Sequence, residues 1–267
     1  RLRQGRRRLS RLPHFVVVFF RWFPAVTWDV VTMTCCGRLY AGVARNGRAR
    51  LSELRDHSVH GAAAVVIDNA SGDVLALVGS ADYFAPGTGQ VNGAWAKRSA
   101  GSTLKPFTYL LALEHGATAA SVIADVRTSF PARDGFYRPE NYNRRCYGPV
   151  SYRTALASSL NIPAVKVLLA AGGPEALHER LREVGLTTLN HPAEVYGLGL
   201  TLGNCEARLL ELTNAYASLA RLGEYRPWRI LRDAPTFSRT YSRPELVWEI
   251  ADIMSDNAAR TLSFGIN

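Results

Sequence analysis

Apolar residues follow two different spacings along this chain, and the change between them divides it into two kinds of structure. Continuous apolar runs cover residues 62–68 and 73–79. Between them stands Asn69-Ala-Ser-Gly72, whose residue types favour a tight turn. The two runs therefore predict an antiparallel hairpin with one or both faces buried.

Beyond residue 100 the apolar residues recur at helical spacing instead. We expect helices at residues 102–115, 151–160, 174–185, 206–220 and 244–254. Gly116 supplies a C-terminal cap for the first of these, and Ser151 supplies an N-terminal cap for the second. A hairpin followed by a block of helices indicates an α+β fold rather than alternating βαβ units.

The N-terminal region lacks this regular pattern. Arginines between Arg1 and Arg11 precede an apolar segment at residues 15–20, which Arg21 interrupts. A basic stretch before an apolar one is typical of a signal peptide or anchor, but this apolar stretch is short. We therefore assign residues 1–51 to a basic linker or remnant of a preceding domain, and residues 52–267 to the main domain.

Charge and composition exclude several classes of function for that main domain. The chain has 32 basic and 22 acidic side chains, and residues 1–50 hold eleven of the basic ones and one of the acidic ones. The remaining residues therefore carry equal numbers of basic and acidic side chains and are neutral overall. Nucleic-acid binding by the main domain is not expected. The four cysteines and six histidines form no CxxC or HExxH pattern, so we expect neither a metal nor another cofactor. The sequence contains no run of about 18 uncharged apolar residues, so it predicts no complete transmembrane helix.

One tetrapeptide, Ser102-Thr-Leu-Lys105, combines a nucleophile with a base. A spacing of three places both side chains on one face of a helix, so we expect them within hydrogen-bonding reach, about 2.6–3.2 Å. Free N–H groups at the start of the helix would stabilise negative charge near Ser102. Lys105 can act as the base if its environment lowers its pKa. Taken alone, the motif also fits a capped surface helix.

A second polar pair, Ser159-Leu-Asn161, follows 57 residues after Ser102. The hydroxyl of Ser159 could relay a proton to a leaving group, and the amide of Asn161 could bond both the lysine and a substrate carbonyl. Helix capping is the alternative explanation for this pair. Ser255-Asp-Asn257 has the same spacing, and we interpret that one as capping.

Three segments that contain or accompany these motifs, residues 98–107, 157–164 and 196–204, resemble the transpeptidase domain of class A penicillin-binding proteins. The resemblance implies the penicillin-recognising serine transpeptidase/β-lactamase-like fold, an antiparallel sheet plus a helical subdomain. It implies that Ser102 attacks the D-Ala-D-Ala bond of peptidoglycan stem peptides, with Lys105 as base and Ser159 and Asn161 as the second motif. β-Lactam antibiotics would acylate the same serine.

The resemblance also implies a setting for the chain. Such domains belong to bifunctional synthases with a glycosyltransferase domain, at the periplasmic face of the bacterial inner membrane, held there by an N-terminal anchor that this chain lacks. The family's third motif, Lys-Thr/Ser-Gly, is absent before Asn267. We therefore expect a chain truncated at both ends, with a fold incomplete at the C-terminus and little activity by itself. A serine β-lactamase or DD-carboxypeptidase, and a non-catalytic β-lactam-binding module, are the alternatives.

Overall fold

A computed structural model describes residues 15–22, 36–54, 59, 61–87, 89–132, 135–231 and 234–265, the first segment by its backbone. The arginine-rich start at residues 1–11 and the last two residues lie outside this part. The chain divides into two compact units. Unit 1 comprises Arg1–Lys97 with Arg208–Thr240, and unit 2 comprises Arg98–Ala207 with Tyr241–Asn267.

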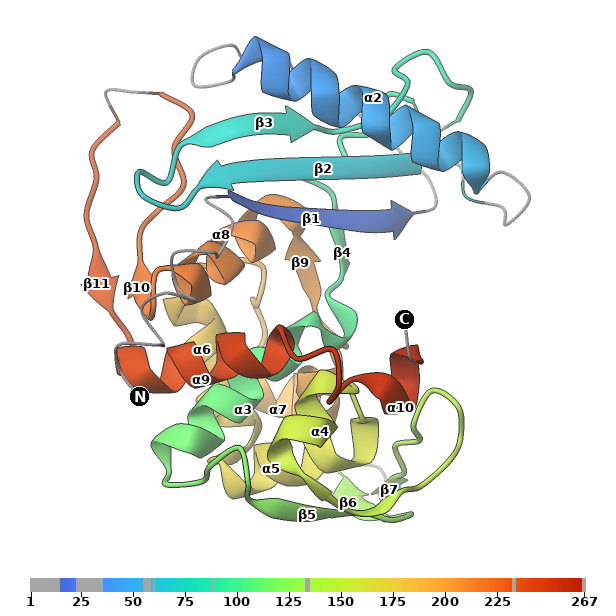
Figure 1. Cartoon of the computed structure of the whole chain (residues 1–267), viewed down its shortest axis with the longest axis vertical. Helices are drawn as coiled ribbons and strands as arrows, with labels where there is room; N and C mark the ends of the chain where they lie inside the picture. The colour runs from blue at the N-terminus through green and yellow to red at the C-terminus, as the bar shows by residue number, and fades with distance from the viewer. Residues whose placement is uncertain are drawn as a thin grey trace. The chain divides into compact units, whose positions relative to one another are not determined.

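Unit 1 is built on a three-stranded antiparallel sheet in the order β1-β2-β3 (Figure 1). The strands are β1 (Phe15–Trp22), β2 (Gly61–Asp68) and β3 (Val74–Val78). The predicted hairpin of β2 and β3 is confirmed. Asp68 stabilises the turn of this hairpin, because its Oδ1 accepts hydrogen bonds from the N–H groups of Ala70 and Ser71 at 3.0 and 2.7 Å.

Helices cover both faces of this sheet, α2 (Gly37–Glu53) on one side and α8 (Leu209–Ala220) on the other (Figure 1). Successive residues of a strand point to opposite faces. Accordingly, Val65 of β2 is buried in a cluster with residues of α8, whereas Ala64 next to it is buried with Ala44 of α2. This double cover explains why β2 is a continuous apolar run rather than an alternating one.

Two of these elements, β1 and α2, come from the region that sequence analysis assigns to a linker or remnant. β1 pairs with β2 over eight residues, from Phe15 opposite Asp68 to Trp22 opposite Gly61. Its Val- and Phe-rich sequence has high β-propensity, and its length suits a strand better than a membrane segment. The boundary between residues 51 and 52 stays a prediction.

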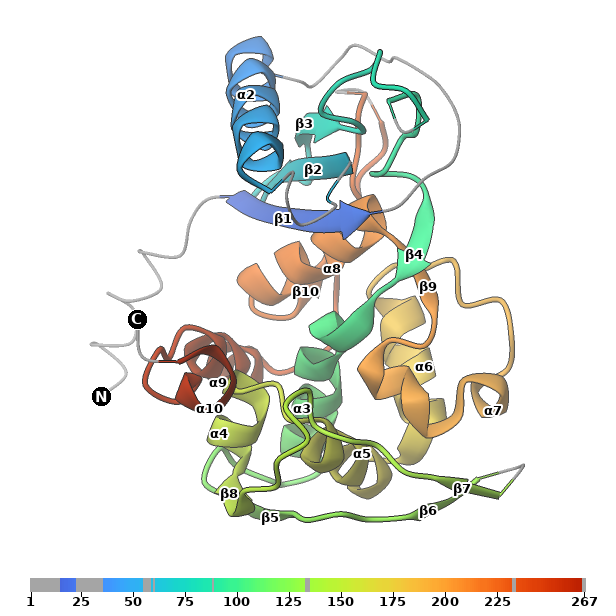
Figure 2. The same cartoon turned by 90° about the vertical axis from the view of Figure 1, so that its right-hand side faces the viewer.

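Unit 2 is mainly helical (Figure 2). A 3-10 turn η2 (Gly101–Leu104) leads into α3 (Lys105–Glu114), which is buried from Lys105 to Leu113. Around α3 lie α4 (Tyr152–Ala157), α5 (Asn161–Ala170), α6 (Gly173–Glu183) and α9 (Pro244–Met254). The remaining short helices are α7 (Ala193–Tyr196), η3 (Gly197–Leu202) and α10 (Thr261–Phe264).

Short strands connect these helices. They pair as β4 (Lys97–Ser99) with β9 (Glu206–Arg208), β5 (Val122–Asp125) with β8 (Gly148–Ser151), and β6 (Phe130–Ala132) with β7 (Gly135–Tyr137). In unit 1, β10 (Glu224–Tyr225) pairs with β11 (Arg239–Thr240). Of the described helices, none has the length and apolarity needed to cross a bilayer.

Three of the predicted helix boundaries need correction. The helix expected from residue 102 begins at Lys105, because residues 101–104 form the 3-10 turn η2. The helix expected at 151–160 ends at Ala157, and α5 begins at Asn161, so Pro163 lies in the first turn of a new helix. Proline is tolerated there because the first helical N–H groups have no partner within the helix. The helix expected from residue 206 begins at Leu209, since residues 206–208 form β9.

Candidate active site

Ser102 lies exposed in the turn η2, immediately before α3. Gly101 adopts φ of +56°, a left-handed conformation that glycine accepts without strain. Gly203, with φ of +79°, packs against it so closely that a Cβ on Gly203 would overlap the backbone of Gly101. The hydroxyl of Ser99 donates a 2.6 Å hydrogen bond to the carbonyl of Gly203. The backbone ahead of Ser102 is therefore held by the segment that follows η3.

Lys105 is the buried base candidate, with 1% of its surface exposed. Its Nζ donates hydrogen bonds to the carbonyl of Ser159 at 2.5 Å, to the Oγ of Ser159 at 3.1 Å and to the Oδ1 of Asn161 at 2.7 Å. All three acceptors are neutral. Burial lowers the pKa of Lys105 from 10.5 to about 7. Near neutral pH a substantial fraction of the amine is therefore unprotonated and able to accept a proton.

Ser102 and Lys105 are not hydrogen-bonded through their side chains, within the part of the chain that is described. The backbone N–H of Lys105 donates to the carbonyl of Ser102, which places the residues one tight turn apart. The amine of Lys105 is directed to Ser159 and Asn161 instead. The expected direct contact between the two side chains is therefore absent from the structure.

Ser159 has an unusual backbone conformation, with φ of +54°. It occupies the sharp turn between α4 and α5, where its N–H donates to the carbonyl of Leu156 at 2.9 Å. A left-handed conformation costs a residue with a side chain about 1–2 kcal/mol, and such strain is concentrated at functional sites. The conformation directs both the carbonyl and the hydroxyl of Ser159 to Lys105.

Asn161 is the first residue of α5, and its amide is bonded at both ends. Oδ1 accepts from Lys105, while Nδ2 donates to the carbonyl of Glu140 at 2.7 Å. Because Nδ2 is a donor and Oδ1 an acceptor, these two partners fix the orientation of the amide. The structure thus brings Lys105, Ser159 and Asn161 into one cluster and leaves Ser102 one turn away.

A buried pair that sequence analysis does not identify lies behind Asn161. Asn141 accepts a 2.8 Å hydrogen bond from the N–H of Asn161, and its Nδ2 donates to both carboxylate oxygens of Asp125 at 2.9 Å. Both side chains are buried. The sequence signal for this pair is weak, because Asn141 lies in a loop and its spacing from Asn161 matches no helix or strand period.

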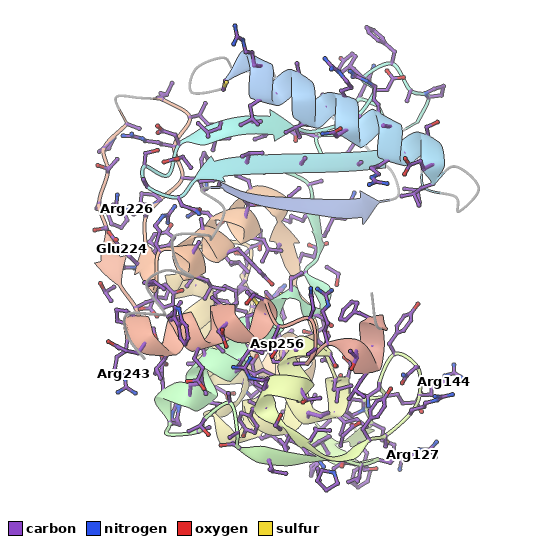
Figure 3. All side chains as sticks on the ribbon, viewed as in Figure 1. Arg127, Arg144, Glu224, Arg226, Arg243 and Asp256 are labelled. Carbon is purple, nitrogen blue, oxygen red and sulfur yellow. The ribbon has the colours of Figure 1, made fainter. Side chains whose placement is uncertain are left out.

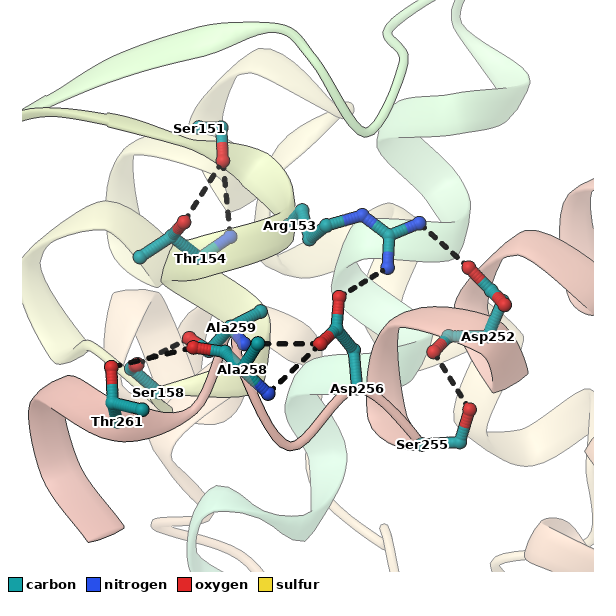
Figure 4. A network of polar contacts seen from close by, with 10 residues as sticks. All are labelled: Ser151, Arg153, Thr154, Ser158, Asp252, Ser255, Asp256, Ala258, Ala259 and Thr261. Carbon is teal, nitrogen blue, oxygen red and sulfur yellow. Dashed lines mark hydrogen bonds and ion pairs between the residues drawn. The ribbon is translucent and has the colours of Figure 1, made fainter. Parts of the chain in front are cut away.

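The rival pair at residues 255–257 lies elsewhere in unit 2. Ser255 ends α9, and its Oγ donates to the carbonyl of Asp252 at 2.9 Å, a capping contact (Figure 4). Ser255 and Asn257 are both exposed. Among the described residues, the side-chain partners of Lys105 come from Ser159 and Asn161 rather than from this pair.

An ion-pair network fastens α4, which leads to Ser159, onto α9 (Figure 4). Arg153 of α4 bonds Asp252 at 2.7 Å and Asp256 at 3.0 Å. The hydroxyl of Ser158, next to Ser159, donates to the carbonyl of Ala259 at 2.9 Å. The serine turn is therefore anchored from the side of α9 as well as by Lys105.

The charges of the surface are separate from this buried cluster. Arg127 and Arg144 project outward from unit 2 (Figure 3). Arg144 approaches Glu140 at 3.8 Å, and both side chains are mostly exposed, so the pair contributes little to stability. The low pKa of Lys105 follows from burial, not from a nearby arginine.

Comparison with known proteins identifies a family that covers most of the chain. The family description "Penicillin binding protein transpeptidase domain" matches residues 62–264. The chain is 38% identical over 198 residues to penicillin-binding protein 1C of Escherichia coli (strain K12), covering 73% of this chain and 25% of that protein. It is 34% identical over 165 residues to penicillin-binding protein 1A of Neisseria cinerea, covering 61% of this chain and 20% of that protein.

Solved structures agree on the fold. The PonA1 protein from Mycobacterium tuberculosis in complex with penicillin V superposes with a TM-score of 0.69 at 22% identity, covering 88% of this chain and 65% of that one. Penicillin-binding protein 1A from Haemophilus influenzae gives a TM-score of 0.64 at 24% identity, covering 74% and 35%. The expected α+β fold is thereby confirmed. The chain spans at most about a quarter of the length of these curated relatives.

Proposed function

Because this chain belongs to the family of penicillin-binding protein transpeptidase domains, we propose that it cross-links peptidoglycan by serine acyl transfer. The observation that carries the proposal is the environment of Lys105. Its amine is buried among neutral acceptors, which lowers its pKa to about 7 and makes it a base at neutral pH. A lysine on a capped surface helix would be exposed and protonated.

In the first half-reaction, Ser102 is the nucleophile. Lys105 accepts the hydroxyl proton while Oγ forms a bond to the carbonyl carbon between the two D-Ala residues of a stem peptide. The tetrahedral intermediate then breaks its C–N bond. The departing D-Ala amine takes up a proton, and the stem peptide remains as an ester on Ser102. The exposure of Ser102 at the start of α3 supports this role, because substrate can reach it.

In the second half-reaction, the amine of a neighbouring stem peptide attacks the ester carbonyl. The amine loses a proton as the new C–N bond forms, and the C–O bond to Ser102 breaks as Oγ regains one. We assign the proton relay to Ser159, since its hydroxyl lies 3.1 Å from the amine of Lys105. We assign Asn161 to hold Lys105 and to bond a substrate carbonyl.

The proposed partners and location follow from the same family. We propose that β-lactam antibiotics acylate Ser102, because they mimic the D-Ala-D-Ala unit. The domain would work in a larger synthase with a glycosyltransferase domain, at the periplasmic face of the bacterial inner membrane.

Covalent labelling by a fluorescent penicillin tests the assignment. In the complete gene product that contains this chain, we expect stoichiometric labelling, and Ser102→Ala should abolish it because the proposal assigns the ester to Ser102. Ser255→Ala is the matched control, an exposed serine whose bond lies within its own helix end, and it should label like the wild type. Labelling that survives Ser102→Ala would overturn the proposal.

Penicillin labelling of the 267-residue chain by itself is a second measurement. They contain no Lys-Thr/Ser-Gly tripeptide. The family resemblance implies that this motif supplies an oxyanion N–H, and loss of one such donor lowers a rate by about 10²–10³. We therefore expect weak labelling of this chain, and strong stoichiometric labelling would show that the third motif is dispensable. Hydrolysed rather than cross-linked product from the complete protein would favour a carboxypeptidase.

A further inference from the structure

The N-terminus of α5 is capped by a side chain from a distant loop. A helix begins with N–H groups that have no partner within the helix, and the N-cap side chain normally accepts from them. Here the N-cap residue is Leu160, whose apolar side chain cannot do so. Instead, the Oδ1 of Asn141 accepts from the N–H of Asn161 at 2.8 Å and from that of Ile162 at 3.4 Å.

Asn141 can act in this way because its own amide is fully bonded. Its Nδ2 donates to both oxygens of Asp125 at 2.9 Å and to the carbonyl of Arg145 at 2.8 Å. Asp125 at the end of β5 also accepts from the N–H of Tyr147 at 2.9 Å. A carboxylate can only accept, so it forces the Nδ2 end of Asn141 towards itself and the Oδ1 end towards α5.

The charge on Asp125 has the right sign for this position. Asp125 is fully buried, and within the described ranges its carboxylate pairs with amides rather than with a cation. The N-terminus of a helix carries partial positive charge, which a negative group nearby stabilises. Asn141 lies between the carboxylate of Asp125 and the first turn of α5 and bonds both. The carboxylate thereby fixes the Asn141 amide, and the amide fixes the start of α5.

The orientation of Asn161 in turn affects the amine of Lys105, which it bonds. The backbone N–H of Asn161 donates to Asn141, and its side-chain Nδ2 donates to the carbonyl of Glu140. These two bonds orient Asn161 so that its Oδ1 accepts from Lys105 at 2.7 Å. We propose that Asp125 and Asn141 are positioning residues of the acyl-transfer site, which set Asn161 and the neighbouring Ser159 against Lys105. This inference rests on the proposed function, in which Lys105 is the base.

The rate of acylation by a fluorescent penicillin tests the proposal in the complete gene product. Asn141→Ala should lower the second-order acylation rate constant about 10- to 100-fold, as expected when a catalytic group is misplaced by a fraction of an ångström to one ångström. It should also move the acid limb of the pH profile upward by about one unit, because a loosened, hydrated Lys105 binds its proton more tightly. Because stability also changes with pH, the rate constant is taken per folded molecule, with the folded fraction measured at each pH.

A matched control separates a positioning role from the general cost of removing a buried asparagine. Asn214 is also buried, and its Nδ2 donates to the carbonyl of Arg226 at 2.8 Å within unit 1. Asn214→Ala should lower the melting temperature and keep the acylation rate and pH profile of the wild type. Equal rates and profiles for the two variants would overturn the proposal.

An exchange of the two side chains keeps the test valid if Asn141→Ala does not fold. Asn141→Asp alone places two carboxylates against each other and should slow acylation. Adding Asp125→Asn restores one carboxylate facing one amide, so the double variant should recover at least about tenfold of the lost rate. No recovery in a folded double variant would contradict the proposal. An unlabelled wild type, or labelling independent of Ser102, would instead overturn the proposed function, and this inference with it.

Discussion

The Oδ1 of Asn161 accepts a 2.7 Å hydrogen bond from the Nζ of Lys105. This contact joins the first residue of α5 to the first residue of α3, two helices whose starts are 56 residues apart along the chain. Because the acceptor is a neutral amide, it holds the amine without adding the negative charge that would favour protonation. The lowering of the pKa of Lys105 by burial is therefore not offset by a carboxylate at this position.

Replacement of Asn161 by aspartate tests this electrostatic point. Asn161→Asp conserves the shape and places a carboxylate on the amine, so the pKa of Lys105 should rise by about 1–3 units. Acylation by penicillin at pH 7 should fall and recover partly as the pH is raised towards 9. Asn161→Ala is the control, since it removes the bond without adding charge and should recover less at high pH. A similar pH profile for both variants would contradict the argument.

The burial of Lys105 also predicts how stability depends on pH. Its pKa is about 7 in the folded state and 10.5 when unperturbed, so between these values the unfolded chain binds more protons. The free energy of unfolding should therefore rise with pH across this window, by up to about 1.4 kcal/mol per unit. Urea unfolding at pH 7, 8 and 9 should show this slope in the wild type and lose it in Lys105→Met.

Lys166 provides the comparison for that measurement. Its Nζ donates to the carbonyl of Ala124 at 2.7 Å, and this bond lies in an exposed position. Lys166→Met should therefore keep the pH slope of the wild type. If Lys105→Met and the wild type had parallel stability profiles between pH 7 and 9, the depressed pKa of Lys105 would be wrong.

Local sequence signals predict the parts of the fold that local interactions decide. The hairpin of β2 and β3 is apparent because a continuous apolar run needs cover on both faces and Asp68 to Gly72 are turn residues. The break at Ser159 is not apparent. Its φ of +54° is held by Lys105, 54 residues earlier, and not by any preference of serine.

The same distinction applies to the candidate site. The residue types and spacings of Ser102, Lys105, Ser159 and Asn161 fit helix capping as well as acid-base chemistry. They are selected because the segments that contain them resemble a known family. Asn141 and Asp125 are ordinary loop and strand residues until tertiary packing buries them together. The register of β1 on β2 is likewise decided by pairing with a strand 39 residues further on, which no local pattern encodes.

Gly203 should be intolerant of a side chain because of its contact with the turn that carries Ser102. Gly203→Ala adds a Cβ that meets the N and O atoms of Gly101, and it also strains a residue with φ of +79°. We expect a lower melting temperature and slower acylation, since Gly101 must shift. Gly116→Ala is the control, with φ of +92° and open space around its Cβ. It should lose stability through strain, about 1–2 kcal/mol, and acylate normally.

The ion pair of Arg153 and Asp252 should stabilise the folded state more than an exposed ion pair with a similar distance does. Arg153 meets Asp252 at 2.7 Å with side chains 32% and 19% exposed, whereas Arg50 meets Glu53 at 2.6 Å with side chains 78% and 60% exposed. Solvent screens the second pair more strongly, and its long side chains lose more freedom on pairing.

Double-mutant cycles measure this difference directly. A cycle with Arg153→Met and Asp252→Asn should give a coupling free energy of about 1 kcal/mol, and one with Arg50→Met and Glu53→Gln should give about 0.3 kcal/mol. Added salt should reduce the second value proportionally more, because that pair lies in solvent. Since Arg153 belongs to α4, its loss should also loosen the turn at Ser159 and slow acylation modestly. Equal coupling in the two cycles would mean that partial burial does not strengthen the anchoring of α4 to α9.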